Sequence, residues 1–440
     1  MTLLLLGAGA LLAALGTRAA GLAFVGAAVL AVTGITLAAP AAWTAATALG
    51  LVALRASPRR LAVPVLGAAA ALAVGSARNT AVVAAAWVLA TAAAVISRGR
   101  GAEGDRWAMT VCLADLPLLG AVVWTALRVG FEGWPQELDT VGVVLLLVAA
   151  ALRAPLASGP QDDVPEPGLL VVRVQTVVLL VVATGTGGLD RNLLVGMAVL
   201  GAIGFAAAGV ARRSATRDVV QEIALVALML AAGRLGWAPQ GWEWGALAAG
   251  TLIHNLRLRL GLGPPGPLAG TLLNGGGIGL PFLPVVLVGL EGSLRADDWV
   301  RMVVIAGLVG GLAARAGSAP AVTRRRRPAR WELAAGAGVT AAAAAAGLWA
   351  PVLTLPTSVA GGEIGWPPAW AIGAAVFLGA VASLRPLPDG TPPSRPERRS
   401  LADLRVPAKW IRPGAVTGAV VTLAAVSLAV WIIGVLRGFL

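Results

Sequence analysis

The chain has 440 residues, of which 58% are hydrophobic and 12% charged, and its mean hydropathy is +0.83. This composition excludes a soluble domain and is typical of a helical protein that crosses a membrane many times. The net charge of +13 does not indicate nucleic-acid binding, because the arginines lie between apolar runs, where they orient a membrane protein. One Cys and one His exclude an internal disulfide, a thiolate cluster and a His-rich centre, so we expect no bound metal or cofactor.

About sixteen apolar runs follow one another along the chain. They predict an all-α polytopic fold with about 14–16 transmembrane helices. The first run has no basic segment before it and no cleavage site after it, so we expect a span and not a removed signal. The longer runs can each cross a hydrocarbon core of about 30 Å. The runs lie near residues 2–16, 19–39, 41–54, 61–77, 80–97, 107–128, 139–157, 167–185, 190–211, 217–235, 242–262, 267–290, 299–317, 331–350, 369–384 and 413–437.

The loops alternate in charge. Most of the 34 Lys and Arg residues fall in loops that follow odd-numbered spans, including the basic segments 321–330 and 385–412. Cytoplasmic loops are the ones enriched in Lys and Arg, so these loops are expected inside the cell and both termini on the extracytoplasmic side of a bacterial plasma (inner) membrane. The two basic segments are also expected to contact anionic lipids.

A compact, proline-rich segment interrupts the apolar pattern between residues 139 and 190. Two apolar runs there flank Arg153, Pro155 and the acidic pair Asp162 and Asp163, and the second run carries Arg173. A charged side chain inside a span costs at least about 2.5 kcal/mol on insertion scales, so it usually faces protein or a water-filled cavity. This hairpin is therefore the first place to look for a site.

The hairpin resembles the antiporter-like membrane subunits of respiratory complex I, Mrp-type cation/proton antiporters and membrane-bound hydrogenases. Those subunits have a Lys in a broken helix, then a Pro-x-His-x-Trp-x-Pro-Asp turn, a Pro-x-Pro and a His-x-x-Thr. The framework positions of that pattern that this chain keeps are Pro155, Asp162, Pro165, Pro167 and Thr176.

The chain departs from the family at the positions that carry protons. The Lys position is Ala150, with Arg153 three residues on, and the His of the second helix is Arg173. In an earlier helix the family has a Trp-Glu pair, where this chain has Trp87 followed by Val88. The resemblance therefore indicates a degenerate member, in which proton translocation is weakened or lost.

The resemblance also implies two inverted five-helix repeats with broken helices. We expect N-terminal helices in 1–60, the first repeat in 61–188, the second in 189–320, and C-terminal helices with basic loops in 321–440. The helix breaks are expected at Pro155 and at Asn274, Gly276 and Pro281. For the glycine-rich break, a close-packing surface explains the sequence equally well.

Six residues are candidates for an ion path or a buried charge: Asp115, Arg153, Arg173, Glu222, His254 and Arg257. Arginine does not release its proton near neutral pH, so Arg173 is interpreted as a fixed cation that pairs with a carboxylate. Asp115 is the preferred candidate for this partner, and Asp162 or Asp163 is the alternative.

Plainer explanations also fit some of these residues. Glu222 also fits a plain interfacial residue, since it lies one turn from Arg217 and Asp218 and can reach the headgroups. Arg257 and Arg259, at a basic helix end, are more typical of an orientation signal near the headgroups, and His254 is more typical of a hydrogen-bonded packing residue.

Two functions remain open. In the first, the chain is a non-catalytic, antiporter-like membrane subunit of a complex I-related, ion-translocating oxidoreductase assembly, with a structural or coupling role and other membrane subunits as partners. In the second, it is a stand-alone secondary transporter or permease. Neither involves nucleic acid.

Overall fold

A computed structural model of the protein describes residues 62–98, 102–157, 167–209, 214–237 and 296–317, with a few positions between 419 and 429. All elements within these ranges are helical, and the protein is an all-α polytopic membrane protein. Five of the described helical stretches are long and apolar enough to cross a bilayer: 80–98, 104–129, 140–157, 168–185 and 191–209. The predicted spans outside the described ranges, and so the total count, stay predictions.

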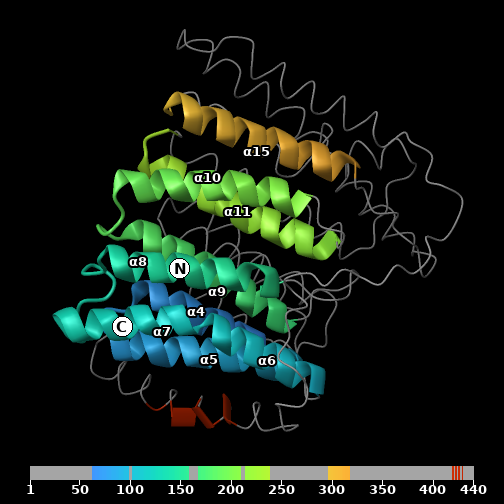
Figure 1. The fold of residues 1–440 in the computed structure, drawn as a ribbon. Coiled ribbons are helices and arrows are strands. Elements are labelled where there is room, and N and C mark those ends of the chain that lie inside the picture. The colour runs from blue at the N-terminus through green and yellow to red at the C-terminus, as the bar shows by residue number, and fades with distance from the viewer. Residues whose placement is uncertain are drawn as a thin grey trace, which may run out of the picture. The chain divides into compact units, whose positions relative to one another are not determined.

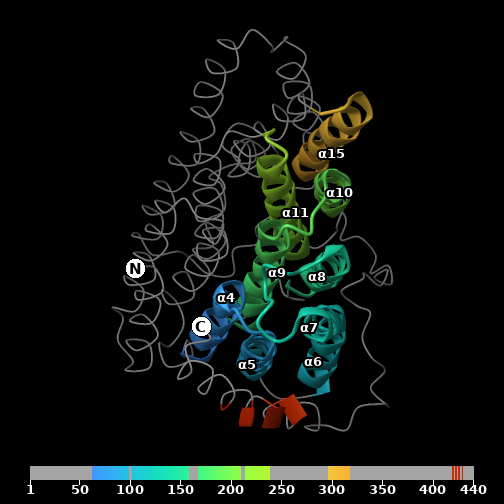
Figure 2. The ribbon, with the colours of Figure 1, turned by 90° about the vertical axis from the view of Figure 1, so that its left-hand side faces the viewer.

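The first unit contains α4 (Ala62–Ser76), α5 (Thr80–Arg98), α6 (Ala102–Ala114), α7 (Leu116–Val129), α8 (Thr140–Arg153), a 3-10 turn (Ala154–Ala157) and α9 (Pro167–Gly185). Figure 1 shows these helices as the blue to green ribbons, and α9 packs against α4, α5 and α8 (Figure 2). Of the 18 residues Gly168–Gly185 of α9, 94% are buried, so this helix is surrounded by protein and can hold polar side chains away from lipid.

Local sequence explains where these helices begin. The Asn79 side chain accepts a hydrogen bond from the Ala81 amide at 2.9 Å before α5, and Asp139 accepts one from Gly142 at 2.9 Å before α8. Pro167 is the first residue of α9, a position where its missing N–H costs nothing. Gly168 lies against the backbone oxygen of Ala94, so any side chain there would push α9 away from α5.

The second unit includes α10 (Arg191–Gly209, from Leu193 on), α11 (Ser214–Arg234) and α15 (Asp298–Gly317). Its helices approach closely at glycines. A Cβ at Gly201 would lie 2.9 Å from the Ala224 oxygen, and one at Gly307 would lie 2.7 Å from the Ala202 oxygen. Small residues that let backbones meet are the usual means of packing helices within a bilayer.

One predicted span differs from the structure in its interior. The run near 107–128 is two helices, α6 and α7, which meet at Asp115. The run near 139–157 is α-helical to Arg153 and continues as a 3-10 turn that contains Pro155, the residue at which a helix break is expected. Proline lacks the N–H that an α-helix needs and crowds the carbonyl four residues earlier, and Pro117 explains the first interruption in the same way.

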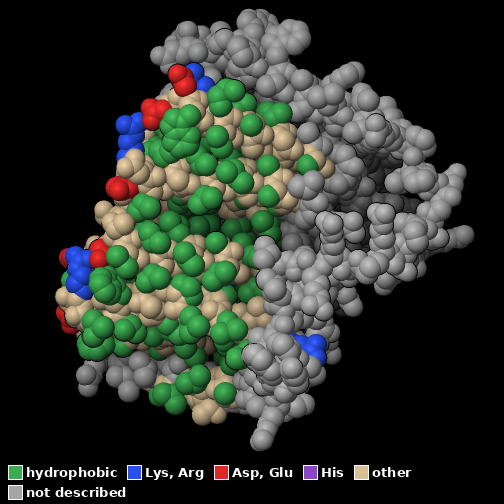
Figure 3. Space-filling view, viewed as in Figure 1, with side chains coloured by type: hydrophobic (Ala, Val, Ile, Leu, Met, Phe, Trp, Pro, Cys, Tyr) green, Lys and Arg blue, Asp and Glu red, His purple; other side chains and the backbone are tan. Residues whose placement is uncertain are grey.

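The outer face of α7 and α8 is apolar. Hydrophobic side chains are spread over the described surface in Figure 3, and charged ones gather near helix ends. The large exposed apolar residues on these two helices are Leu116, Val123, Trp124, Leu127, Val129, Val141, Val144, Val148 and Leu152. Such a face suits lipid or another membrane subunit, since neither requires polar groups from it.

Candidate functional site

Arg153 is the last residue of α8, and its side chain is fully buried, with 0% exposed. Side chains of a helix lean toward its N-terminus, so a residue at the C-terminal end of α8 reaches back over the preceding turn. That turn contains Ala150, which is small and 2% exposed, on the same buried face. The guanidinium is thereby directed into the helix bundle and away from the loop that follows.

Asp115 lies at the junction of α6 and α7 and is 5% exposed. Its amide still donates to the Val111 oxygen at 3.1 Å, so the two helices remain nearly continuous. Its own side chain makes no capping bond to α7. The carboxylate is therefore free of local backbone contacts and points toward other helices.

These two charges belong to a closed ring of hydrogen bonds, here called the Arg153 ring, made by Arg153, Asp115, Thr91 and Gln175. Arg153 Nη1 donates to Asp115 Oδ1, and Nη2 donates to Gln175 Oε1. Thr91 Oγ1 donates to Asp115 Oδ2 at 3.0 Å, and Gln175 Nε2 donates to Thr91 Oγ1 at 3.1 Å. Helices α5, α8 and α9 and the α6–α7 junction each contribute one member.

The aromatic ring of Trp87 covers one face of the guanidinium. Arg153 Cζ lies 4.8 Å from the centroid of the Trp87 ring, and Trp87 is 1% exposed. Trp87 and Thr91 are four residues apart on α5, so they share a face of that helix. A planar guanidinium combines such stacking with two in-plane hydrogen bonds, which a lysine ammonium cannot do.

The arrangement suits a fixed charge and not a proton relay. The ion pair is neutral overall, and both oxygens of the Asp115 carboxylate accept hydrogen bonds. The partner cation is a guanidinium, which does not release its proton near neutral pH. Within the described residues, no group of three or more His, Cys, Asp or Glu could hold a metal ion.

The other predicted site residues are not part of this ring. Arg173 lies on α9, is 5% exposed, and is two positions from Gln175, so the two residues point to nearly opposite sides of the helix. The first-choice pairing of Arg173 with Asp115 is wrong, since Asp115 pairs with Arg153. The alternative partners Asp162 and Asp163 lie outside the described residues.

Glu222, on α11 in the second unit, is 2% exposed and thus faces protein, next to Gln221, whose Nε2 donates to the Phe205 oxygen at 3.1 Å. The remaining predicted residues, for the ion path and for the glycine-rich break, lie outside the described residues: His254, Arg257, Asn274, Gly276 and Pro281.

Gln175 and Thr91 are not among the residues predicted for the site, and Trp87 is named from the sequence only as the Trp that the resembled family shares. Gln175 is a single amide in an otherwise apolar run, while Thr91 and Trp87 resemble ordinary core residues. The only available signal was the i, i+4 spacing of Trp87 and Thr91 on one helix face. Nothing in the sequence says that this face meets α8 and α9.

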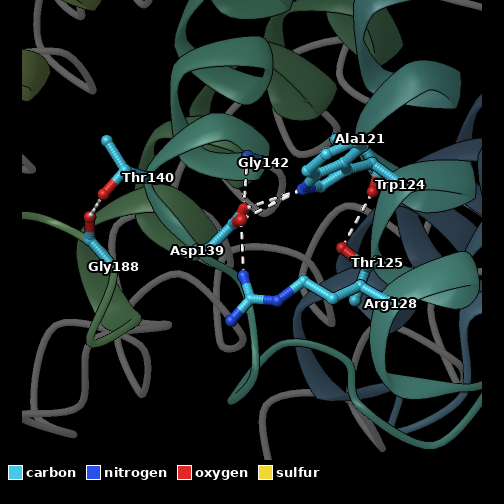
Figure 4. A network of polar contacts seen from close by, with 8 residues as sticks. All are labelled: Ala121, Trp124, Thr125, Arg128, Asp139, Thr140, Gly142 and Gly188. Carbon is cyan, nitrogen blue, oxygen red and sulfur yellow. Dashed lines mark hydrogen bonds and ion pairs between the residues drawn. The ribbon is translucent and has the colours of Figure 1, made fainter.

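A second polar cluster lies at the rim, where α7 ends and α8 begins (Figure 4). We call it the Asp139 cluster: Asp139 accepts hydrogen bonds from Trp124 Nε1 at 3.0 and 3.2 Å, from Gly142 N at 2.9 Å and forms an ion pair with Arg128. The Gly142 amide is the main reason why the pKa of Asp139 lies below its ordinary value of 3.8. Burial, the second-largest effect, opposes this shift, and the hydrogen bonds from Trp124 and Arg128 and the charge of Arg128 lower the pKa further.

Comparisons with known proteins bear on the fold. No family model matches the chain, and no curated protein sequence matches it. Among solved structures, the chain is similar to a chain in respiratory complex I from Thermus thermophilus with bound aureothin, with a TM-score of 0.57 and 15% sequence identity. The similarity covers 81% of this chain and 99% of that chain. The protein therefore shares its fold with a chain of respiratory complex I.

Proposed function

We propose that the protein is an antiporter-like membrane subunit of a complex I-related, multi-subunit assembly, in which it has a structural or coupling role and translocates few or no protons. The fold that it shares with a chain of respiratory complex I supports the first part of this proposal. The Arg153 ring supports the second part.

The Arg153 ring is the observation that carries the proposal. In the resembled family a Glu and a Lys carry protons, and their positions here are Val88 and Ala150. Neither side chain can bind a proton. Arg153, three residues after Ala150, and its partner Asp115 are held in a closed ring whose cation does not release its proton near neutral pH.

A role as scaffold agrees with the packing of the first unit. The ring joins four parts of the unit through residues that are at most 5% exposed, and it does so at the two places where spans are interrupted. Breaking one partner of a buried ion pair is strongly destabilising, so the pair holds the interruptions in one geometry. A rigid unit with an apolar outer face is suited to transmit or support the movement of neighbouring subunits.

Purification from native membranes tests the assembly. The tagged full-length chain, extracted in a mild detergent, is expected to elute with other membrane subunits and with redox subunits in constant stoichiometry. Elution of the chain alone, as a monomer or as copies of itself, would contradict the proposal and favour a stand-alone transporter.

Proton counting tests the translocation part. In the reconstituted assembly, the double substitution Glu222→Gln and His254→Ala removes two candidate proton carriers of the chain. We expect the number of protons moved per electron to stay unchanged. A lower stoichiometry, with assembly and electron transfer intact, would show that the subunit pumps.

A further inference from the structure

Two N–H donors at the Arg153 ring have no hydrogen-bond acceptor within the part of the chain that the structure describes. They are Trp87 Nε1 and Arg153 Nε, and both atoms are buried. The two side chains are 1% and 0% exposed and stack on each other, with Cζ 4.8 Å from the ring centroid. Buried N–H groups in folded proteins are almost always satisfied, by protein or by ordered water.

We infer that the stacked pair of Arg153 and Trp87 binds one internal water molecule, which accepts hydrogen bonds from Trp87 Nε1 and Arg153 Nε. Both groups are donors only, so the occupant must be an acceptor. Water molecules buried in proteins typically make about three hydrogen bonds to polar groups that otherwise lack partners. The site therefore has the chemistry of an internal water position.

A neutral acceptor fits this site better than a halide. The positive charge of Arg153 is already balanced by Asp115, which is hydrogen-bonded to the same guanidinium. A bound anion would place a second negative charge near this carboxylate in a medium of low dielectric constant, where the repulsion is strong. Water satisfies both donors without that repulsion.

The bound water has a consequence for proton movement. It accepts hydrogen bonds from a guanidinium that does not release its proton and from an indole N–H, so it hydrates the ring without receiving a proton from either donor. This inference does not depend on the proposed function, because the two donors require an acceptor in a scaffold and in a transporter alike.

A structure of the full-length chain in lipid nanodiscs or in its assembly, at a resolution that shows ordered water, is the direct test. We expect a density peak within hydrogen-bonding distance, about 2.7–3.2 Å, of both nitrogens. A map without such a peak, or with a protein group in its place, overturns the inference. Crystals grown in bromide distinguish the occupants, since an anomalous peak at this position would identify a halide and also overturn it.

The substitution Trp87→Phe gives an independent test in solution. It keeps an aromatic face under Arg153 and removes the N–H. If water is bound, the variant loses a hydrogen bond, and the ratio of folded to unfolded protein should fall by roughly fivefold or more. If the N–H is unsatisfied, its removal should leave the ratio unchanged or raise it.

Trp134→Phe is the matched control. Trp134 is fully buried and its Nε1 donates to the Val74 oxygen at 3.1 Å, so this variant measures the loss of a known indole hydrogen bond together with the change in volume. A fall for Trp87→Phe that is similar to the fall for Trp134→Phe supports the water site. A clearly smaller fall, or none, contradicts it.

Discussion

Two arginine–aspartate pairs in the first unit differ mainly in where they lie. Arg153 and Asp115 have side chains that are 0% and 7% exposed, whereas those of Arg128 and Asp139 are 49% and 23% exposed. The buried pair joins residues 38 positions apart across a helix bundle, and the rim pair joins the end of one helix to the start of the next. The same chemistry therefore serves packing in one place and a helix end in the other.

The difference lies in the cost of separating the charges. At the rim, water and salt can solvate either charge, so an exposed pair contributes only about 0–1 kcal/mol. In the bundle, neither charge can reach water, and removal of one partner leaves the other uncompensated. The comparison predicts that the buried pair is sensitive to single substitutions and that the rim pair is not.

The largest effect is expected for Arg153→Leu. The variant leaves the Asp115 carboxylate without its cation and Gln175 without its donor, so we expect a loss of about 3–5 kcal/mol in the free energy of unfolding. Denaturant unfolding of the purified chain in mixed micelles measures this loss. The double substitution Arg153→Leu with Asp115→Leu should cost less than Arg153→Leu alone, and a double variant that costs as much would contradict the coupling of the two charges.

An intermediate effect is expected for Arg153→Lys. Lysine keeps the charge but cannot donate to Asp115 and Gln175 through a planar fork while stacking on Trp87. We expect a loss of about 1–3 kcal/mol, the cost of an unsatisfied buried polar group. Gln175→Leu is the matched variant, because it removes the same Arg153–Gln175 hydrogen bond from the other side. If Arg153→Lys is as stable as the wild type, the fork geometry has no energetic role.

Much of the architecture could be predicted from the sequence. The run near 80–97 corresponds to α5 at 80–98, and the run near 167–185 corresponds to α9 at the same residues, because the length of an apolar run is a local property. The interruption at Asp115 was missed although Pro117 lies two residues later, since proline is tolerated in many membrane helices.

The pairing within the site could not be predicted. Arg153 and Arg173 both lie in or beside apolar runs, and the sequence does not show which helix face meets which neighbour. Arg173 lies inside its apolar run, and Asp115 is the first partner expected for it. In the structure, Arg153 reaches back along α8 and takes that partner, while Arg173 points to another side of α9. Contacts between helices are set by tertiary packing.

At the rim, Asp139→Ala should have a small effect of about 1 kcal/mol, the usual cost of losing an N-cap side chain. Asp139→Asn keeps an oxygen for the Gly142 amide and should cost less. The folded-state pKa of Asp139 is lowered, so its contribution is present above its ordinary value of 3.8 and is lost as the pH falls through the folded-state pKa. The difference between wild type and Asp139→Asn should therefore shrink in acid. A difference that grows as the pH falls would contradict the lowered pKa.

The smallest effect is expected for Arg128→Gln. Its side chain is 49% exposed, and Asp139 keeps its bonds to Gly142 and Trp124 when the ion pair is lost. We expect a change of at most about 1 kcal/mol in the free energy of unfolding. Even this should disappear in 1 M salt, where the screening length is about 3 Å. The coupling between Arg153 and Asp115 is measured by the double-mutant cycle of Arg153→Leu and Asp115→Leu. It should persist at that salt concentration, because a buried pair is screened much less than an exposed one. If the Arg153–Asp115 coupling fell with salt as much as the effect of Arg128→Gln, water would reach the Arg153 ring, and the contrast between the two pairs would fail.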